Sequence, residues 1–265
     1  MTTRELLIAH AIYYKGNWLQ IYRVLVTRKY IPDEESARLL ANMRCKAITI
    51  LDPEYPEYLR QMTKPPFVLF YYGDINLISD SNRCLAVVGT RNPSPKGIDI
   101  TRKIVKDTCK DYITVSGMAS GIDRIAHETA INNRGKTVAV LGSGIDVCFP
   151  SENSDIYEII RNNHLVISEY PEGCPPGKMS FPIRNRIVAM ISKALLVTES
   201  KIHSGTSITV NYALDYGKNV MAVPSTDYGD SGCNLYIKQG AFLVEDAVDV
   251  EFVMDYKKLL YGIKY

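Results

Sequence analysis

The sequence predicts an α/β protein in which a doubly wound, mostly parallel sheet is preceded by a small helical domain. From residue 83 onward, apolar and often β-branched runs of four or five residues alternate with Gly/Ser/Thr/Pro-rich loops and amphipathic segments. Strands that alternate with helices form parallel sheets, and a short unbroken apolar run is typical of a strand buried on both faces. At roughly 100 to 200 residues per domain, the 265 residues fit one large domain with an appendage.

The first 50 residues predict the small helical domain. Apolar residues recur at helical spacing from Leu6 to Tyr14 and from Trp18 to Leu25. Another helix is expected at Pro32-Asp33, because proline favours the first helical position and acids favour the first turn. Residues 51–80 contain four prolines before an apolar run over 67–72, which predicts a connector that ends in one strand.

Residues 81–265 predict the α/β domain itself. Helices of 10 to 15 residues are expected between the strands, for example over 122–133 and 206–216. The expected strands are all short and bounded by turn residues, and they cover 85–88, 113–115, 137–141, 165–168, 194–198, 220–223 and 242–244.

The composition excludes several classes of protein. With 46% hydrophobic residues, 17 glycines and 13 prolines, the chain is neither disordered nor collagen-like, and it has enough apolar residues to bury a core. The net charge is +2, and residues 1–80 and 81–265 are both close to neutral. Because proteins that neutralise phosphates usually show a basic excess, any polyanion must be bound locally.

Cysteine spacing and hydropathy limit the site chemistry and the compartment. The six cysteines lie at least 25 residues apart, so no pair has the spacing of zinc ligands. No apolar run approaches the roughly 18 residues of a membrane span, and no secretory leader is evident. We expect a cytoplasmic protein with reduced thiols, without a metal, a cofactor or membrane contact.

Glycine- and hydroxyl-rich loops follow the expected strands. Examples are Gly89-Thr90-Arg91, 116–123, Gly142-Ser143-Gly144 and Ser204-Gly205-Thr206. In a parallel sheet these loops share the carboxyl edge, where each also opens a helix, so backbone N–H groups point at that edge. We expect an anionic ligand there, although any one glycine alone is explained equally well by a tight turn.

Two stretches near these loops contain basic residues and no acid. Residues 81–98 include Arg91, and residues 173–198 include Arg184 and Arg186 on either side of Asn185. Arginine forks suit bidentate phosphate contacts, and Phe181 offers a base-stacking face or an ordinary core ring. The near-neutral chain therefore contains a local phosphate-binding pattern.

Catalytic patterns are not recognisable. Neither a G-x-G-x-x-G turn nor a G-x-x-x-x-G-K-[ST] loop is present. His127 lies where a helix packs on the sheet, which favours a structural histidine. Cys148 has no paired histidine in the pattern and is interpreted as a buried thiol.

The ordered loop motifs resemble those of the DNA-processing protein A family (DprA/Smf) from about residue 50 to 245. They include Gly89-Thr90-Arg91, Ser116-Gly117-Met118-Ala119-Ser120-Gly121, Phe149-Pro150, Phe181-Pro182-Ile183-Arg184-Asn185-Arg186 and Gly232-Cys233-Asn234. The resemblance implies a Rossmann-like homodimer, not an enzyme, that binds and protects incoming single-stranded DNA and loads RecA recombinase during natural transformation. The N-terminal helices resemble a small, sometimes SAM-like, domain of some members.

The resemblance and the loop pattern together give the expected DNA-binding residues. They are Gly89, Thr90, Arg91, Ser116, Gly117, Gly121, Gly142, Gly144, Lys178, Phe181, Arg184, Asn185, Arg186, Ser204, Gly205 and Thr206. The chain departs from the family pattern at Thr90, Phe149 and Ser225, where serine, tyrosine and glycine are common, and Ser151 replaces a lysine found in some members. Only about 20 residues follow the expected fold, so we expect no C-terminal winged-helix domain.

An alternative keeps the same fold with a different ligand. Related Rossmann-like nucleotide sensors and nucleoside-monophosphate phosphoribohydrolases also bind phosphate along this edge. The hydrolases contain a glycine-rich turn that is followed by a catalytic glutamate. By resemblance, Thr209 occupies the position of that glutamate here. This residue argues against hydrolysis.

Overall fold

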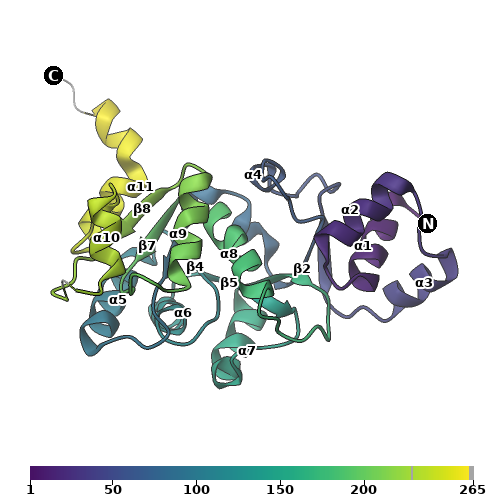
Figure 1. Ribbon diagram of the computed structural model, residues 1–265, viewed down its shortest axis with the longest axis horizontal. Helices are drawn as coiled ribbons and strands as arrows, with labels where there is room; N and C mark the ends of the chain where they lie inside the picture. The colour runs from purple at the N-terminus through teal and green to yellow at the C-terminus, as the bar shows by residue number, and fades with distance from the viewer. Residues whose placement is uncertain (228, 263–265) are drawn as a thin grey trace.

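One sheet runs through the computed structural model, which describes residues 1–227 and 229–262, with side chains described as far as Asp255. Its strand order is β1-β2-β6-β5-β4-β3-β7-β8-β9 (Figure 1). Strands β3 to β9 pair with one another in parallel, whereas β2 pairs antiparallel with β1 and β6. The predicted doubly wound, mostly parallel α/β fold is confirmed. The strands are Lys46–Thr49, Val68–Gly73, Cys84–Val88, Ile113–Ser116, Thr137–Gly144, Leu165–Tyr170, Ala194–Val197, Asn219–Ala222 and Phe242–Leu243 for β1 to β9.

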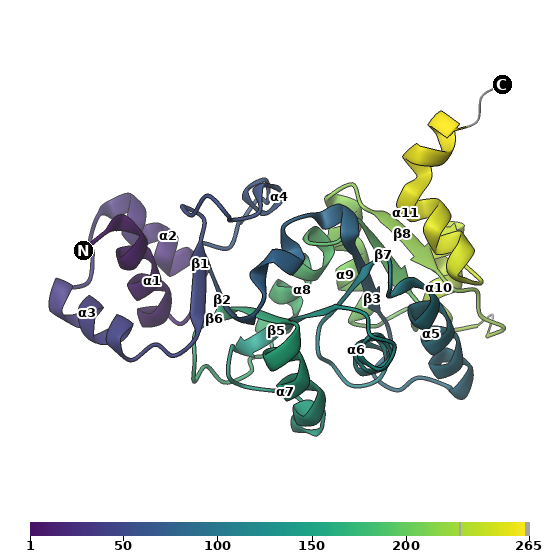
Figure 2. The same ribbon diagram turned by 180° about the vertical axis from the view of Figure 1, so that it is seen from behind.

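Helices cover both faces of the sheet, as comparison of Figures 1 and 2 shows. One face carries α5 (Pro95–Thr108), α6 (Ile122–Asn132), α7 (Ser154–Asn163) and α11 (Ala247–Gly262). The other carries α4 (Glu57–Arg60), α8 (Ser180–Met190), α9 (Thr206–Asp215) and α10 (Gly232–Lys238). Single 3₁₀ turns occupy Ile75–Ile78, Ser81–Arg83 and Ser151–Asn153. Within the described residues, no helix is both long enough and apolar enough to cross a membrane.

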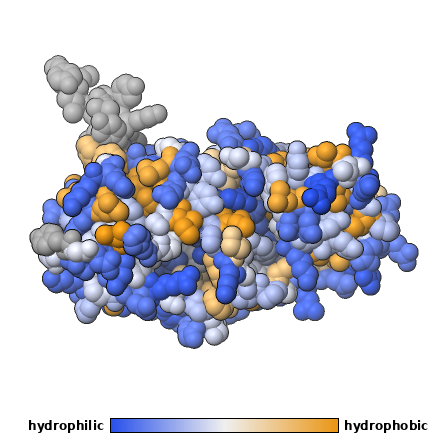
Figure 3. Space-filling view, in the orientation of Figure 1, coloured by the Kyte–Doolittle hydropathy of each residue, from blue (hydrophilic) through white to orange (hydrophobic). Residues whose placement is uncertain are grey.

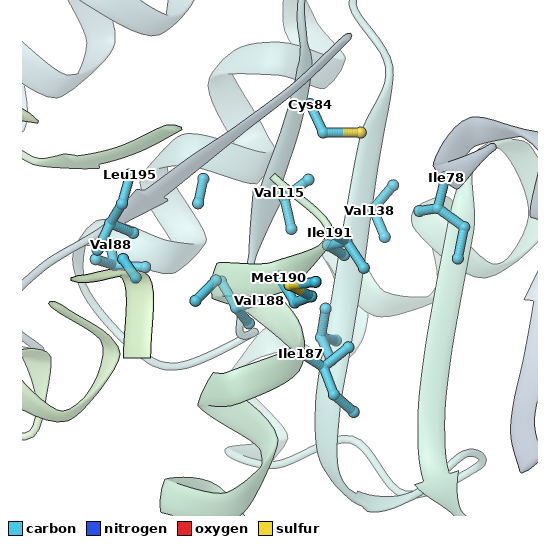
Figure 4. Packing of buried hydrophobic residues seen from close by; sticks show 14 of the residues in the cluster. Ile78, Cys84, Val88, Val115, Val138, Ile187, Val188, Met190, Ile191 and Leu195 are labelled. Atoms are coloured by element: carbon cyan, nitrogen blue, oxygen red, sulfur yellow. The ribbon is translucent and has the colours of Figure 1, made fainter. Parts of the chain in front are cut away.

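Alternation along the strands supplies both layers of the core. Leu85 and Val87 pack with α5 and α6, whereas Val88, Val115 of β4 and Val138 of β5 share a cluster with residues of α8 such as Ile187 (Figure 4). Successive side chains of a strand point to opposite faces, so a strand between two helical layers must be apolar at every position. This explains the unbroken apolar runs in the sequence.

The N-terminal helices lie against the edge of this sheet beyond β6 (Figure 1). They are α1 (Thr3–Tyr13), α2 (Trp18–Thr27) and α3 (Asp33–Ala41). Leu7 and Ile21 share a buried cluster with Phe70 of β2 and Ile156 of α7. The division at residue 50 places β1 in the helical segment, whereas β1 already belongs to the sheet through its antiparallel pairing with β2. A four-residue strand with one exposed end carries too little hydrophobic pattern to be recognised.

The chain reverses its winding direction between β3 and β7. These strands are neighbours, with β4 on the far side of β3 and β8 on the far side of β7. The loops that follow them therefore run away from each other, which opens a crevice at the carboxyl edge. Open α/β folds bind their ligands at such a point.

Candidate functional site

A pocket of about 400 Å³ opens at this switch point. It lies between the carboxyl ends of β3 and β4 and the first turns of α8 and α9. The structure thus brings together residues that are far apart in the sequence. Those expected from the sequence that line the pocket are Gly89, Thr90, Arg91, Gly117, Phe181, Arg184, Asn185, Ser204, Gly205 and Thr206.

The loop after β3 is fixed by backbone hydrogen bonds on both sides. The Thr90 N–H donates to the Glu199 carbonyl at 2.8 Å, and the Thr90 carbonyl accepts from Ile122 N at 3.1 Å. A side chain at Gly89 would lie 2.7 Å from that Glu199 oxygen, so only glycine allows this approach. Arg91 follows on this rigid support with an exposed side chain, and the described residues give it no ion pair. Its guanidinium group is therefore available to a ligand.

The floor of the pocket is a buried charged network around Gly117. The Asp123 carboxylate accepts from the N–H groups of Gly117 at 3.1 Å and Ala119 at 3.2 Å. Arg184 donates to the Gly117 and Val140 carbonyls. Burial raises the pKa of Asp123, an effect that Arg184 opposes, and burial lowers the pKa of Arg184 to about 10. Arg184 remains charged at neutral pH and holds the loop after β4 in place.

Arg186 lies outside the pocket. Its guanidinium donates to both carboxylate oxygens of Glu169, at 2.6 and 2.7 Å, and links α8 to β6. Burial raises the pKa of Glu169, and Arg186 opposes this shift. Residues two apart in a helix point in nearly opposite directions, so Arg184 and Arg186 do not face one ligand. This placement does not support the prediction that Arg186 contacts phosphate, whereas Asn185 between them lines the pocket.

The other expected residues surround the pocket without lining it. The buried Ser116 hydroxyl donates to the Val87 carbonyl at 2.7 Å. Gly121 has φ +73° and passes close to the Thr90 carbonyl, and Gly144 packs against the backbone of Cys174. Lys178 is exposed in the loop before α8. Three of these residues support the loops, and Lys178 presents an exposed positive charge two residues before α8.

Two aromatic rings form one rim of the pocket. The centroids of Phe149 and Phe181 lie 5.5 Å apart, and Phe149 is 46% exposed. Phe181 lies directly on Gly142, where an added Cβ would be 2.7 Å from its ring and 3.2 Å from its Cα. Gly142 thus has a packing role beneath the aromatic rim. The rings offer a surface on which a planar base can stack.

The helices that begin at this edge differ in whether a side chain caps the backbone N–H groups of the first turn. At α5, Ser94 Oγ accepts from Gly97 N at 3.1 Å, and the Glu199 carboxylate accepts from Ser94 N at 3.0 Å. Ser231 likewise caps α10. At α9, which begins after Gly205 beside the pocket, no side chain caps the helix. The expectation that every loop presents free N–H groups is therefore too broad, because Glu199 and Ser231 occupy two of these helix starts.

His127 is held in the core, whereas Cys148, expected to be buried, is only half-buried because it lies in the loop after β5. His127 is fully buried, its Nδ1 lies 2.7 Å from Thr137 Oγ1, and burial lowers its pKa to about 3. Burial raises the pKa of Cys148 to about 11, which keeps its thiol protonated at neutral pH. The described residues contain no group of three His, Cys, Asp or Glu side chains that could hold a metal ion.

Sequence reasoning left out some residues that line the pocket. Asn92, Ala119, Pro182, Val188, Ile208 and Thr209 contribute to its walls. Asn92 and Ala119 belong to the loops already identified, so loop membership is a usable signal. Pro182 and Val188 reach the pocket through the orientation of α8, which no local pattern in the sequence reveals.

Comparison with known proteins places the chain in a family. The family described as DNA recombination-mediator protein A matches residues 46–254. DNA processing protein DprA of Streptococcus pneumoniae is 40% identical over 206 residues, which cover 77% of this chain and 72% of that protein. DprA of Bacillus subtilis is 36% identical over 219 residues, covering 80% and 73%.

Solved structures agree with this relationship. The X-ray structure of DprA from S. pneumoniae superposes with a TM-score of 0.80 at 34% identity, covering 93% of this chain and 92% of that chain. DNA processing protein A from Helicobacter pylori, described with a single-stranded DNA binding mode, superposes with a TM-score of 0.71 at 26% identity, covering 83% and 98%. The sequence relatives, the shared fold and the pocket motifs agree, and the chain belongs to the DNA recombination-mediator protein A family.

Proposed function

We propose that this protein binds single-stranded DNA in the pocket at the switch point. In this proposal it is a homodimer and not an enzyme, protects incoming DNA and loads RecA recombinase onto it during natural transformation. The DNA contacts come from Gly89, Thr90 and Arg91, from Gly117 and Asn185, from the start of α9 and from the aromatic rim.

One observation supports the DNA contact above all. An unpaired Arg91, the uncapped start of α9 and the Phe149–Phe181 rim meet around the same pocket. An arginine and helix N–H groups suit phosphate oxygens, and aromatic rings suit unpaired bases whatever their sequence. The structure reported for the H. pylori relative, described with single-stranded DNA binding, agrees with this ligand.

The carboxylates around the pocket favour a binding role over hydrolysis. Among the described lining residues, Asp123 is the sole carboxylate, and it already accepts two backbone hydrogen bonds. Thr209, at the position of the hydrolase glutamate, is 3% exposed. Incubation with nucleoside monophosphates should release no base or ribose phosphate above a buffer blank. Steady turnover would refute the non-enzymatic assignment.

Substitution of Arg91 tests the DNA site. Arg91→Ala should weaken binding of labelled single-stranded oligonucleotides by a similar factor for all sequences, about tenfold, and should reduce the slope of log affinity against log salt by about one. Fluorescence anisotropy across a salt series measures both effects. Arg83→Ala is the matched control, because Arg83 is also exposed but lies at the amino end of β3. Equal losses in the two variants would contradict the site.

The mediator role needs its own measurements. Sedimentation velocity should give a dimer, and a monomer at micromolar concentration would contradict the homodimer. RecA filament growth on single-stranded DNA covered by a binding protein should speed up when this protein is added. Acceleration should disappear with Arg91→Ala, and acceleration that persists with this variant would separate RecA loading from the pocket.

A further inference from the structure

A column of three stacked aromatic rings lies on the N-terminal part of α2. The Trp18 ring stacks on Tyr22 and on Phe67, with 5.1 Å between centroids in both pairs. The indole N–H donates to the Pro65 carbonyl at 2.8 Å, which fixes the ring. Tyr22, at the end of the column, is 49% exposed. The column therefore presents a rigid aromatic ring to solvent.

The two chain segments that form this column contain basic residues and no acid. Residues 15–32 contain Lys15, Arg23, Arg28 and Lys29 and no acid, and residues 58–73 are also free of acids. Lys64 Nζ lies 5.9 Å from the centre of the Trp18 ring. The described residues give Lys15, Arg23 and Lys64 no ion pair. Figure 3 shows hydrophobic side chains among strongly hydrophilic ones at this end of the molecule.

The column lies at the same edge of the sheet as the pocket. Gly16, just before α2, packs against the Glu169 carbonyl and the Tyr170 ring, at the carboxyl end of β6. Phe67 precedes β2, which runs antiparallel to β6, so the start of β2 also lies at the carboxyl end of β6. The exposed Phe149 follows β5, which lies between β4 and β6 in the sheet, and the exposed Lys178 belongs to the segment that follows β6. The carboxyl edge thus carries aromatic and basic groups from the pocket to α2.

The opposite direction along the edge is less favourable for a polyanion. A second pocket, of about 550 Å³, lies beyond β7. Its lining carries four carboxylates, those of Glu199, Asp227, Asp230 and Glu245, against two ammonium groups, those of Lys96 and Lys201. A DNA strand that leaves the first pocket on this side would meet net negative charge.

We propose that the DNA strand bound at Arg91 continues over Phe149 and Lys178 to the N-terminal domain, where a base stacks on Tyr22 and phosphates contact Lys15 and Lys64. This proposal rests on the proposed function, because it extends the same strand. Base stacking on an exposed aromatic ring is independent of sequence, and nearby ammonium groups suit the phosphates on either side of the base.

The spacing of the sheet gives the length of DNA required. From β3 to β2 there are four strand spacings, which at about 4.8 Å each amount to about 19 Å. At about 3.4 Å per stacked nucleotide, this distance corresponds to about six nucleotides. A very short oligonucleotide occupies the pocket alone, and a longer one reaches both surfaces.

Trp18 is the single tryptophan of the chain and reports on its own surroundings. Oligothymidylates of about three and about twenty nucleotides are titrated into the wild-type protein, with anisotropy of a labelled end for binding and tryptophan emission for the column. Both should bind, but the longer one alone should quench the emission. Saturation by the longer oligonucleotide without quenching would overturn the proposal and leave the Arg91 site intact.

Two variants with matched controls test the contacts. Tyr22→Ala should lower affinity for the longer oligonucleotide about five- to tenfold and leave the shorter one unchanged. Tyr30→Ala is its control, since Tyr30 is 45% exposed but lies beyond the carboxyl end of α2. Lys64→Gln should reduce the salt dependence for the longer oligonucleotide. Its control is Lys46→Gln. Lys46 Nζ also lies 5.9 Å from the centre of an aromatic ring, that of Tyr71, but Lys46 is at the amino end of β1, away from the carboxyl edge of the sheet.

The outcomes separate this proposal from the proposed function. If Arg91→Ala weakens both oligonucleotides while Tyr22→Ala and Lys64→Gln behave like their controls, the pocket binds DNA and the strand does not reach α2. If Arg91→Ala has no effect on either oligonucleotide, the proposed function itself fails.

Discussion

Arg186 and Glu169 form a buried, two-pronged ion pair, with distances of 2.6 and 2.7 Å and side chains that are 7% and 8% exposed. The pair joins α8 to β6 on the side of the helix that faces away from the pocket. Asn185, one residue earlier, lines the pocket. The neighbouring residues Asn185 and Arg186 therefore have separate roles. Arg186 positions the helix, and Asn185 faces the proposed ligand.

Arg186→Met should destabilise the protein without a specific effect on DNA binding. The substitution leaves the Glu169 carboxylate buried and unpaired, which typically costs about 3–5 kcal/mol in the free energy of unfolding. Urea denaturation measures this loss, and the double variant with Glu169→Gln should recover part of it. If the folded Arg186→Met protein binds single-stranded DNA much more weakly than wild type, Arg186 contacts DNA after all.

Gly205→Asp should stabilise α9 and weaken DNA binding. Gly205 has a negative φ of −61°, and an added Cβ meets nothing within 4 Å, so the substitution causes no clash. A carboxylate at a helix N-terminus adds about 0.3–1 kcal/mol of stability, but here it faces the phosphate position. Gly205→Asn is the uncharged control. Thermal unfolding and anisotropy together check the prediction, and unchanged affinity in the aspartate variant would remove α9 from the site.

Gly142→Ala should weaken DNA binding through Phe181. The added methyl group would lie 2.7 Å from the Phe181 ring and 3.2 Å from its Cα, so the start of α8 has to shift. We expect a loss of stability of about 1–3 kcal/mol together with weaker binding of oligonucleotides. Gly177→Ala is a suitable control, because the nearest atom to an added Cβ there is 3.5 Å away. Equal affinities for the two variants would show that the aromatic rim tolerates displacement.

Because of His127, the free energy of unfolding should be lower in mild acid than at neutral pH. Burial lowers the pKa of His127 to about 3 in the folded state from its ordinary value of 6.5. Between these values the unfolded chain binds a proton that the folded protein does not, so stability is present above pH 6.5 and falls as the pH drops toward 3. At pH 4.5 the loss from this group is about 2–3 kcal/mol.

The pH effect of His127 is isolated by comparison with His127→Gln. Urea denaturation at pH 7.5 and pH 4.5 gives the change in unfolding free energy for both proteins. All other titrating groups are common to the two, so the wild type should lose about 2–3 kcal/mol more than the variant. Identical losses would show that His127 does not titrate differently on folding.

Much of the fold was predictable because each strand is buried on both faces. The strands β3 to β9 lie where the apolar runs predict them, with ends that differ by a few residues. β1 was missed because a strand of four residues with one exposed end resembles a loop. The domain boundary at residue 50 stays a prediction, although β1, which precedes it, pairs with β2 in the sheet.

The sequence predicted which loops form the site. It was less informative about which side chains of these loops and of α8 face the pocket. Arg91 follows a strand directly, so its position at the carboxyl edge follows from the parallel topology. Arg184 and Arg186 both looked like phosphate ligands in the sequence. The structure pairs the buried Arg186 with Glu169 of β6, whereas the buried Arg184 donates to the Gly117 and Val140 carbonyls.

The sequence by itself determined the parallel α/β architecture, the loops at its carboxyl edge and the resemblance to one family, because strand burial and loop glycines leave local patterns. Only the tertiary structure decided which charges remain free. Asp123 and Glu199 accept hydrogen bonds from loop and helix backbones, Arg184 and Arg186 are held in the core, and Arg91 stays exposed. The physical reason is that a charge is paired or available according to neighbours that lie far away in the sequence.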